Sequence, residues 1–440
     1  MAILFAGFKI LAAFAFIPSD QTLYQLGFGF GDYIKSLHTT GRLELCTQSF
    51  CAYAMRMPLI PWLYHLLAYI SEQALVAGLI KNVVMSLVVV VAFRRLLSQQ
   101  SLVHHKAEVP WIWLLPLVIF SPAVIKHASA VTYEEGILIE LLFLWAISFM
   151  LSARLLASGR DQAGPAPVVL NLALATTIFM AKSSMLPLLL ASAGITLIDL
   201  FVRRRLPSVI ALAVALALVL GWGARNESVS GRFSIMTSWD GENMYRGASD
   251  IGYTLYPDVM LDRIFDASEM HMRDGRVIAH TPQVSIGAFK QEWVWNDHYR
   301  DLAISWIKNN PDKALSYTGH KLFNFFLSVE KTPYQYQSDG SEISARFSTQ
   351  NLLTSAWLGL GRLLEVVMAV LLIWLVRQKT RVALSLAIAV VIVNGAYAAP
   401  YVLGFNYERH ITPYLVIVAA CVAFLLAEWR ERRSPAGKHT

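Results

Sequence analysis

The sequence predicts an all-α polytopic membrane protein, a bundle of about ten transmembrane helices with helical extracytoplasmic loops. The first observation is composition: 56% of the 440 residues are hydrophobic and 15% are charged, whereas soluble domains carry about 25% charged residues. The second is the mean hydropathy of +0.49. The third is the recurrence of apolar runs near the length of about 20 residues that a helix needs to cross a bilayer.

Ten apolar segments account for the expected spans: 2–18, 74–94, 109–127, 135–153, 167–181, 184–201, 207–224, 355–376, 382–400 and 410–428. The first could be mistaken for a signal peptide, but it lacks a basic start and Lys9 interrupts it. We therefore predict a retained span, with Lys9 reaching toward the cytoplasmic interface. The fifth is short, and 167–201 could instead be one long helix bent around Lys182.

Lysine and arginine residues gather in alternate connections between these spans, as the positive-inside rule requires of cytoplasmic loops. The basic connections hold Arg94, Arg95, Lys106, Arg154, Arg160, Arg203, Arg204, Arg205, Arg377, Lys379 and Arg381, and the tail adds Arg430, Arg432, Arg433 and Lys438. Both termini are then cytoplasmic. The net charge of +7 follows from this topology, and without a long basic run it gives no indication of nucleic-acid binding.

The same topology divides the chain into three parts. An N-terminal transmembrane module, 1–224, contains a first outer loop at 19–73. A large outer segment, 225–354, follows, and C-terminal helices with a basic tail, 355–440, complete the chain. Long outer loops translocate regardless of their charge, so their own cations do not contradict the layout.

The large outer segment is expected to be helical, since no alternating pattern in it is long enough for a β-domain. Residues 288–309 form an amphipathic pattern, and 312–326 follow Pro311 as a second helix. The apolar side of the first helix would carry Trp295, Tyr299, Leu302 and Trp306.

Two of the three cysteines lie close together in the first outer loop. Cys46 and Cys51 either form a local disulfide, which an extracytoplasmic compartment favours, or remain separate thiols. Cys421 lies in an apolar span and is expected to be a packed thiol.

One cation lies in each short outer turn, where the positive-inside rule does not account for it: Lys126, Lys182 and Arg409. Arg56 is a further cation in the first outer loop. Cations beside a membrane pair with anions, so these side chains either bind a lipid-borne phosphate or anchor the protein to ordinary headgroups.

Carboxylates occupy the same outer positions. Asp20 follows the first span, and Asp32 begins a helical stretch that Gly41 ends. Either aspartate could serve as a general base, although Asp32 could instead cap the helix. Glu134 and Glu135 start the fourth span, where they could cap the helix or bind an acceptor or a metal.

Metal and nucleotide motifs are weak in this sequence. His104 and His105 are adjacent but have no partners at ligand spacing, and Asp297-His298 has no cysteine nearby. No P-loop, dinucleotide-binding glycine motif or nucleophile elbow occurs in a fitting context. No cofactor is firmly indicated, and dependence on a divalent metal stays open.

The order of short motifs resembles the GT-C superfamily of integral membrane glycosyltransferases, in particular its protein-mannosyltransferase and aminoarabinose-transferase branch, glycosyltransferase family 39. The first outer loop is similar in having an acidic residue and an aromatic, a glycine-ended helix and a proline-containing helix, here Asp32-Tyr33, Gly41 and Arg56-Met57-Pro58. Further similar stretches are Leu79-Ile80-Lys81-Asn82, Tyr133-Glu134-Glu135, Ala181-Lys182-Ser183, Asp240-Gly241-Glu242-Asn243, Lys321-Leu322-Phe323 and Tyr407-Glu408-Arg409-His410. The family's acidic pair with a tyrosine four residues later is not intact, because Asp20 and Tyr24 keep only the spacing.

The resemblance implies a GT-C-like bundle and an inverting transfer of a sugar from a polyprenyl-phosphate donor to an acceptor on the extracytoplasmic face. The base would be Asp32 or Asp20. The donor phosphate would be bound by Arg56, Lys182, Arg409, Lys81 and Lys126. The acceptor or sugar would be bound by Tyr33, Tyr24, Glu134, Glu135, Tyr407 and His410. The expected partners are the lipid donor, membrane lipids and a glycan, lipid or protein acceptor, and the expected location is a bacterial inner membrane with the site facing the periplasm.

Two other classes of membrane protein compete with this interpretation. A surface-glycan polymerase or ligase would place its key cations and histidines in a late outer loop. A transporter or flippase of lipid-linked sugars would show inverted repeats or charges at mid-bilayer, and we expect neither from this sequence.

Overall fold

A computed structural model describes residues 2–46, 50–103, 122–131, 133–159, 164–256, 269–273, 276–281, 289, 291–327, 349–406 and 408–433. Most of these residues are helical, and seven of the described helices are long and apolar enough to cross a membrane. The all-α polytopic membrane class is therefore confirmed.

The seven spanning helices match seven of the ten expected spans. Six of them lie within α4 (Ala74–Val103), α7 (Glu135–Ser158), α10 (Leu206–Ser230), α15 (Thr349–Gln378), α16 (Arg381–Leu403) and α17 (Glu408–Arg433). The seventh, Ser183–Arg203, consists of a short 3-10 turn followed by α9 (Leu186–Arg203). The predicted third span lies mostly outside the described residues, which include only its end as α6 (Pro122–Ser129).

Two further expected spans are present as shorter helices, α1 (Ala2–Phe16) and α8 (Ala166–Ala181). At a rise of about 1.5 Å per residue, the 16 residues of α8 measure about 24 Å, less than the hydrocarbon core of about 30 Å. The alternative of one bent helix over 167–201 is wrong. The backbone of Lys182 is extended (φ −151°, ψ 113°), so α8 ends there and a short 3-10 turn, η2 (Ser183–Met185), leads into α9.

The centre of the bundle is formed by α7 and α17, whose side chains are almost all buried. Around them, α4, α9, α10, α15 and α16 each turn an apolar face outward, as Val370 of α15 and Val391 of α16 illustrate. Because the apolar side chains point away from the protein here, this surface suits contact with lipid.

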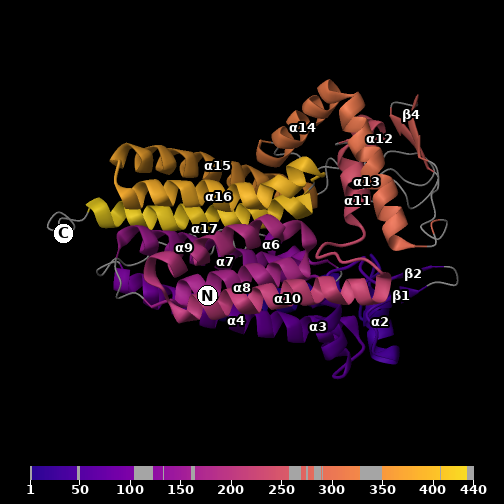
Figure 1. Cartoon of the computed structure of the whole chain (residues 1–440), viewed down its shortest axis with the longest axis horizontal. Coiled ribbons are helices and arrows are strands. Elements are labelled where there is room, and N and C mark those ends of the chain that lie inside the picture. The colour runs from indigo at the N-terminus through magenta and orange to yellow at the C-terminus, as the bar shows by residue number, and fades with distance from the viewer. Residues whose placement is uncertain are drawn as a thin grey trace.

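The loops and short elements gather at one end of the bundle, which we call the loop end (Figure 1). The first loop contributes η1 (Leu23–Gln25), α2 (Phe30–Thr40), β1 (Leu45–Cys46), β2 (Cys51–Ala52) and α3 (Leu59–Ala68). The second segment contributes α11 (Asp240–Gly247), α12 (Asp250–Leu255), β3 (Glu269–Arg273), β4 (Arg276–Thr281), α13 (Glu292–Asn309) and α14 (Pro311–Phe326). Helix α17 ends at the opposite end of the bundle (Figure 1).

The helices expected in the second segment are confirmed as α13 and α14. On α13, Trp295, Tyr299 and Trp306 are buried as expected, but Leu302 is exposed and its assignment to the apolar side was wrong. The β3–β4 hairpin was not expected, although two strands do not make a β-domain.

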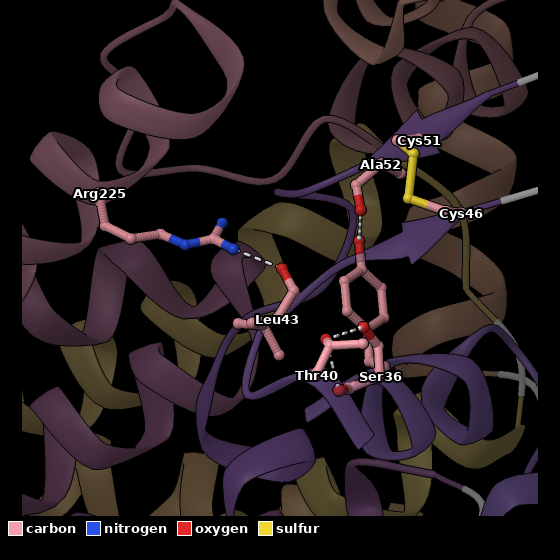
Figure 2. Close-up of a disulfide and its surroundings, with 8 residues drawn as sticks. Ser36, Thr40, Leu43, Cys46, Cys51, Ala52 and Arg225 are labelled. Atoms are coloured by element: carbon pink, nitrogen blue, oxygen red, sulfur yellow. Dashed lines mark hydrogen bonds between the residues drawn. A yellow bond between two sulfur atoms is a disulfide. The ribbon is translucent and has the colours of Figure 1, made fainter. Parts of the chain in front are cut away.

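The disulfide between Cys46 and Cys51 is formed, which decides between the two alternatives for these residues. It closes the antiparallel pair β1–β2 (Figure 2). Arg225 at the end of α10 donates to the carbonyl oxygens of Leu43 and, at 2.6 Å, Tyr53. These bonds tie the first loop to the bundle on both sides of the disulfide.

Lys9 does not reach the cytoplasmic interface, and this expectation was wrong. Its side chain is fully buried, and its Nζ lies 2.6 Å from Oε1 of Glu140 on α7. A lysine in the bundle is tolerated because a carboxylate on the neighbouring helix pairs with it.

A candidate site in the charge cluster at the loop end

Six charged side chains from separate parts of the chain meet at the loop end, and we call them the loop-end cluster: Arg56, Glu134, Glu135, Lys182, Asp240 and Arg409. They come from the loop before α3, the start of α7, the turn between α8 and α9, the start of α11 and the start of α17. Three cations and three carboxylates thus meet where the spans give way to the loops.

Arg56 contacts a backbone carbonyl, a carboxylate and two aromatic rings. Its Nε donates to the carbonyl oxygen of Phe28 at 2.8 Å, and its Nη1 lies 3.9 Å from Oε1 of Glu134. The guanidinium also lies over the rings of Phe30 and Trp239, 5.0 and 5.1 Å from their centroids. Aromatic faces attract a cation without neutralising it, and the separation from Glu134 exceeds a hydrogen bond.

Lys182 forms the tightest ion pair of the cluster. Its Nζ lies 2.7 Å from Oε1 of Glu135, whose side chain is only 2% exposed. Burial by itself would lower the pKa of Lys182, but the Glu135 carboxylate outweighs it and the net pKa lies above the ordinary lysine value. Lys182 therefore stays charged, and Glu135 fixes where that charge is held.

Arg409 is positioned by two aromatic rings and by a hydrogen bond to the adjacent His410. Its guanidinium lies 5.2 Å from the ring centroid of Tyr133 and 5.6 Å from that of Phe28, and its Nε donates to Nε2 of His410 at 3.3 Å. The His410 ring stacks on Tyr401 with centroids 4.4 Å apart. Phe28 thus joins two cations, since its carbonyl accepts from Arg56 and its ring underlies Arg409.

Asp240 is a carboxylate of the cluster, within the electrostatic influence of Arg56, that the sequence did not predict as a site residue. Oδ1 accepts from Ser183 Oγ at 3.1 Å, and Oδ2 accepts from the Thr237 amide at 2.9 Å. Burial raises the pKa of Asp240 to about 6, while these hydrogen bonds and the charge of Arg56 oppose the rise. The carboxyl group therefore titrates close to neutral pH.

Local packing explains why Asp240 and Arg56 meet. Glu292 of α13 accepts from the Ala54 amide at 3.0 Å and from Ser238 Oγ at 2.7 Å, so it ties together the residues two positions before each of them. A Cβ at Gly241 would lie 2.0 Å from the carbonyl oxygen of Asn296, so only glycine lets α11 approach α13 this closely. Two sequence signals pointed to Asp240: its place in the stretch Asp240-Gly241-Glu242-Asn243 that resembles the GT-C superfamily, and Thr237 three residues earlier, a spacing typical of a helix start.

The two aspartates expected to act as base lie elsewhere. Asp20 and Asp32 are both exposed. Helix α2 begins at Phe30 with Gly29 as its N-cap, so Asp32 lies inside the first turn and the capping alternative was wrong. The carboxylates that accompany the three cations are instead Glu134, Glu135 and Asp240.

The remaining predicted binding residues are spread over the loop end. Tyr33 is buried, and its hydroxyl donates to the Ala52 carbonyl at 3.1 Å. Tyr24 donates to Glu72 at 3.1 Å, away from the cluster contacts described above. Lys126 lies 5.9 Å from the ring of Phe16. Tyr407 lies outside the described residues.

Lys81 does not lie among the cluster's cations, although it was expected to bind the donor phosphate. Its side chain is 2% exposed, and its Nζ donates to three backbone carbonyls, those of Ala128, Ala130 and Gly136. All three ammonium protons are used in this way, so none is left for a phosphate in this arrangement.

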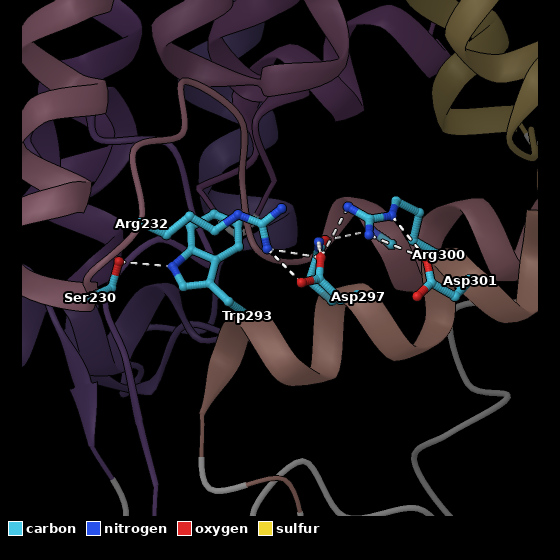
Figure 3. A network of polar contacts seen from close by, with 8 residues as sticks. Ser230, Arg232, Trp293, Asp297, Arg300 and Asp301 are labelled. Carbon is cyan, nitrogen blue, oxygen red and sulfur yellow. Dashed lines mark hydrogen bonds and ion pairs between the residues drawn. The ribbon is translucent and has the colours of Figure 1, made fainter.

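Asp297, which was considered together with His298 as a possible metal-binding pair, forms ion pairs with two arginines instead (Figure 3). Both of its carboxylate oxygens accept from Arg232, at 2.8 and 2.7 Å, and Arg300 lies 3.0 Å away. Arg232 also covers the ring of Trp293, whose indole donates to Ser230. This network joins the end of α10 to α13. Within the described part of the chain, no three His, Cys, Asp or Glu side chains are grouped so that they could hold a metal ion.

Comparison of the chain with protein-family models, with curated proteins and with solved structures found no match. The likeness to the GT-C superfamily therefore remains an expectation from short motifs.

Proposed function

We propose that this chain is a membrane glycosyltransferase that moves a sugar from a polyprenyl-phosphate donor to an acceptor on the extracytoplasmic face. One observation carries the proposal: three cations from three distant segments meet beside carboxylates at the loop end of a membrane bundle. Cations so placed suit the phosphate of a lipid whose tail lies in the bilayer.

The orientation is part of the proposal. Arg154 near the end of α7 pairs with Glu428 near the end of α17 at 2.6 Å, and both helices start at the loop end. The basic connections therefore lie opposite the loop end, which makes the loop end extracytoplasmic by the positive-inside rule. The disulfide at the loop end supports the same orientation, because disulfides persist in oxidising compartments.

The chemistry needs charge stabilisation more than it needs an acid. The acceptor oxygen forms a bond to the anomeric carbon while the bond from that carbon to the phosphate oxygen breaks, and the lipid phosphate leaves with the electron pair. The acceptor proton passes to a carboxylate. Fixed cations such as Arg56 and Arg409 would stabilise the charge that grows on the departing phosphate.

Asp240 is the carboxylate we propose as the base in place of Asp32 or Asp20. It lies within the electrostatic reach of Arg56, and a pKa of about 6 leaves it ionised at neutral pH and still able to accept a proton. Its two oxygens each accept one hydrogen bond, and a carboxylate has lone pairs for more.

A transporter or flippase of the lipid-linked sugar is a second candidate, because one observation favours it. The buried pair of Lys9 and Glu140 is a charge inside the spans, and such charges often mark a substrate or proton pathway.

The test is incubation of the purified protein with a panel of polyprenyl-phosphate sugars and candidate acceptors, followed by mass spectrometry of the lipid products. The wild-type protein should release free polyprenyl phosphate, and Arg56→Gln should slow this release about 100-fold or more. Arg300→Gln is the matched control, since it removes a surface arginine of the same end that is 39% exposed. Asp240→Asn should abolish transfer, whereas Asp32→Asn and Asp20→Asn should retain it.

Two outcomes would count against the proposal. Equal activity of Arg56→Gln and Arg300→Gln would remove the cluster from the reaction. Movement of the intact lipid-linked sugar across proteoliposomes, without any product, would favour the transporter.

A further inference from the structure

Lys81 of α4 connects two neighbouring elements through its ammonium group. Nζ lies 3.1 Å from the Ala128 oxygen, 2.6 Å from the Ala130 oxygen and 3.1 Å from the Gly136 oxygen. Ala128 belongs to the last turn of α6, and Gly136 belongs to the first turn of α7. The last carbonyls of a helix have no partner within it, so Lys81 caps α6 and holds the start of α7 against it.

The segment fixed in this way carries part of the loop-end cluster. Between Ala130 and Gly136 lie Tyr133, which underlies Arg409, and Glu134 and Glu135, which accompany Arg56 and Lys182. A shift of this short segment would move the partners of all three cations together.

The approach of α7 to this segment leaves no room for a larger residue. A Cβ at Gly136 would lie 2.1 Å from the Ala130 oxygen and 3.1 Å from Nζ of Lys81. The first distance is too short for a side chain to be added without moving the backbone, and the second would press the added carbon against the Lys81 ammonium group. Gly136 permits the close approach of α7 to Ala130, and Lys81 stabilises that approach through its hydrogen bonds.

Further buried polar groups fix the part of α4 that carries Lys81. Asn82, the next residue, donates to the Lys9 carbonyl at 3.3 Å, and Lys9 pairs with Glu140 on α7. Charges on Lys9 and Glu140 both act on Lys81. The network links α1, α4 and α7, so the part of α4 that carries Lys81 is fixed relative to both neighbouring helices.

We propose that Lys81 is a positioning residue of the loop-end cluster: it sets the backbone that carries Tyr133, Glu134 and Glu135 and makes no contact with the lipid phosphate itself. This inference deepens the proposed function and rests on it for its catalytic consequence. Its structural consequence can be measured without any substrate.

The first test is hydrogen–deuterium exchange of the substrate-free protein in detergent. Lys81→Met should speed exchange over 128–138 by a factor of about ten or more, because three hydrogen bonds to that backbone are lost. The amides of Gly136 and Leu138, which bond to Tyr133 and Glu134, report on this directly. Lys313→Met, at an exposed lysine paired with Asp250, is the control and should leave this region unchanged.

Gly136→Ala provides a second variant that keeps Lys81. It should speed exchange over the same residues, since the added methyl group must displace the Ala130 carbonyl. The variant also keeps the test decisive if Lys81→Met does not fold. Unchanged exchange at 128–138 in the variants that fold would overturn the inference.

The second test separates positioning from binding in the transfer reaction. Per folded molecule, Lys81→Met should lower kcat with little change in the KM for the polyprenyl-phosphate donor, because the misplaced cations act mainly on the departing phosphate. A raised KM with unchanged kcat would instead identify Lys81 as a phosphate ligand and contradict the inference. If the wild-type protein transfers no sugar, the proposed function fails while the exchange experiment still decides the role of Lys81.

Discussion

The buried pair of Lys182 and Glu135 allows a quantitative prediction of stability. The two groups lie 2.7 Å apart, with the ammonium side chain 16% exposed and the carboxylate side chain 2% exposed. Removing one partner of such a pair leaves a charge without compensation and costs about 3–5 kcal/mol, whereas replacing both by neutral groups of similar size is often close to neutral. We expect Lys182→Met and Glu135→Gln each to lower the free energy of unfolding by about 3 kcal/mol. The double variant should lose only about 1 kcal/mol.

The assay is a double-mutant cycle measured by reversible unfolding in mixed detergent micelles. The coupling between the two substitutions should then be about 5 kcal/mol, above the upper end of about 3 kcal/mol that is usual for residues in contact. Lys313→Met and its partner variant Asp250→Asn form the control cycle, since that pair is exposed and surface pairs couple by at most about 1 kcal/mol. A double variant whose loss equals the sum of the two single losses would refute the reasoning.

Two further predictions concern other parts of the loop end. The carboxyl of Asp240 has a pKa raised from 3.8 to about 6, so the folded state holds a proton that the unfolded state has released. Stability should therefore fall as the pH rises from about 4 to 6, and the fall should be smaller in Asp240→Asn. Thermal melting across that range measures both proteins. Equal pH profiles of the wild-type protein and the variant would contradict the prediction. Replacing Cys46 and Cys51 by serine should cost about 2 kcal/mol for so short a loop. After reduction, a membrane-impermeant maleimide should label both cysteines from outside intact cells, and labelling only after lysis would reverse the proposed orientation.

The sequence predicted the membrane helices well because a lipid-facing helix needs apolar side chains along its whole length, and these are visible in the sequence itself. Faces such as Val366 and Val370 on α15 are apolar over the length of a bilayer, and no distant contact is needed to recognise them. The helix ended by Gly41 and the pair α13 and α14 were also predictable, since glycine and proline mark their ends locally.

The site was predicted only in part because its members are joined by distant contacts. The expectation that Arg56, Lys182 and Arg409 are outer cations came from their place between spans, but their partners could not be read from the chain. Asp240 reaches the cluster through α13 and the first loop, which Glu292 connects over 238 positions. An exposed aspartate such as Asp32 and a half-buried one such as Asp240 look the same in a sequence.

The failures at Lys9 and Lys81 have the same physical origin. A lysine in an apolar run is expected to extend toward water or to meet a lipid phosphate. The alternatives seen here, a carboxylate on α7 for Lys9 and three carbonyl oxygens for Lys81, require helices far apart in the sequence to lie side by side. Only the tertiary arrangement supplies them.

The most direct test of the central claim is the binding of polyprenyl phosphate to the purified protein, measured by native mass spectrometry or by lipid-dependent thermal stabilisation. If the loop-end cluster holds the lipid phosphate, Arg56→Gln should weaken binding about tenfold or more, and Arg300→Gln should bind like the wild-type protein. Equal affinity of all three proteins for the lipid would contradict the account.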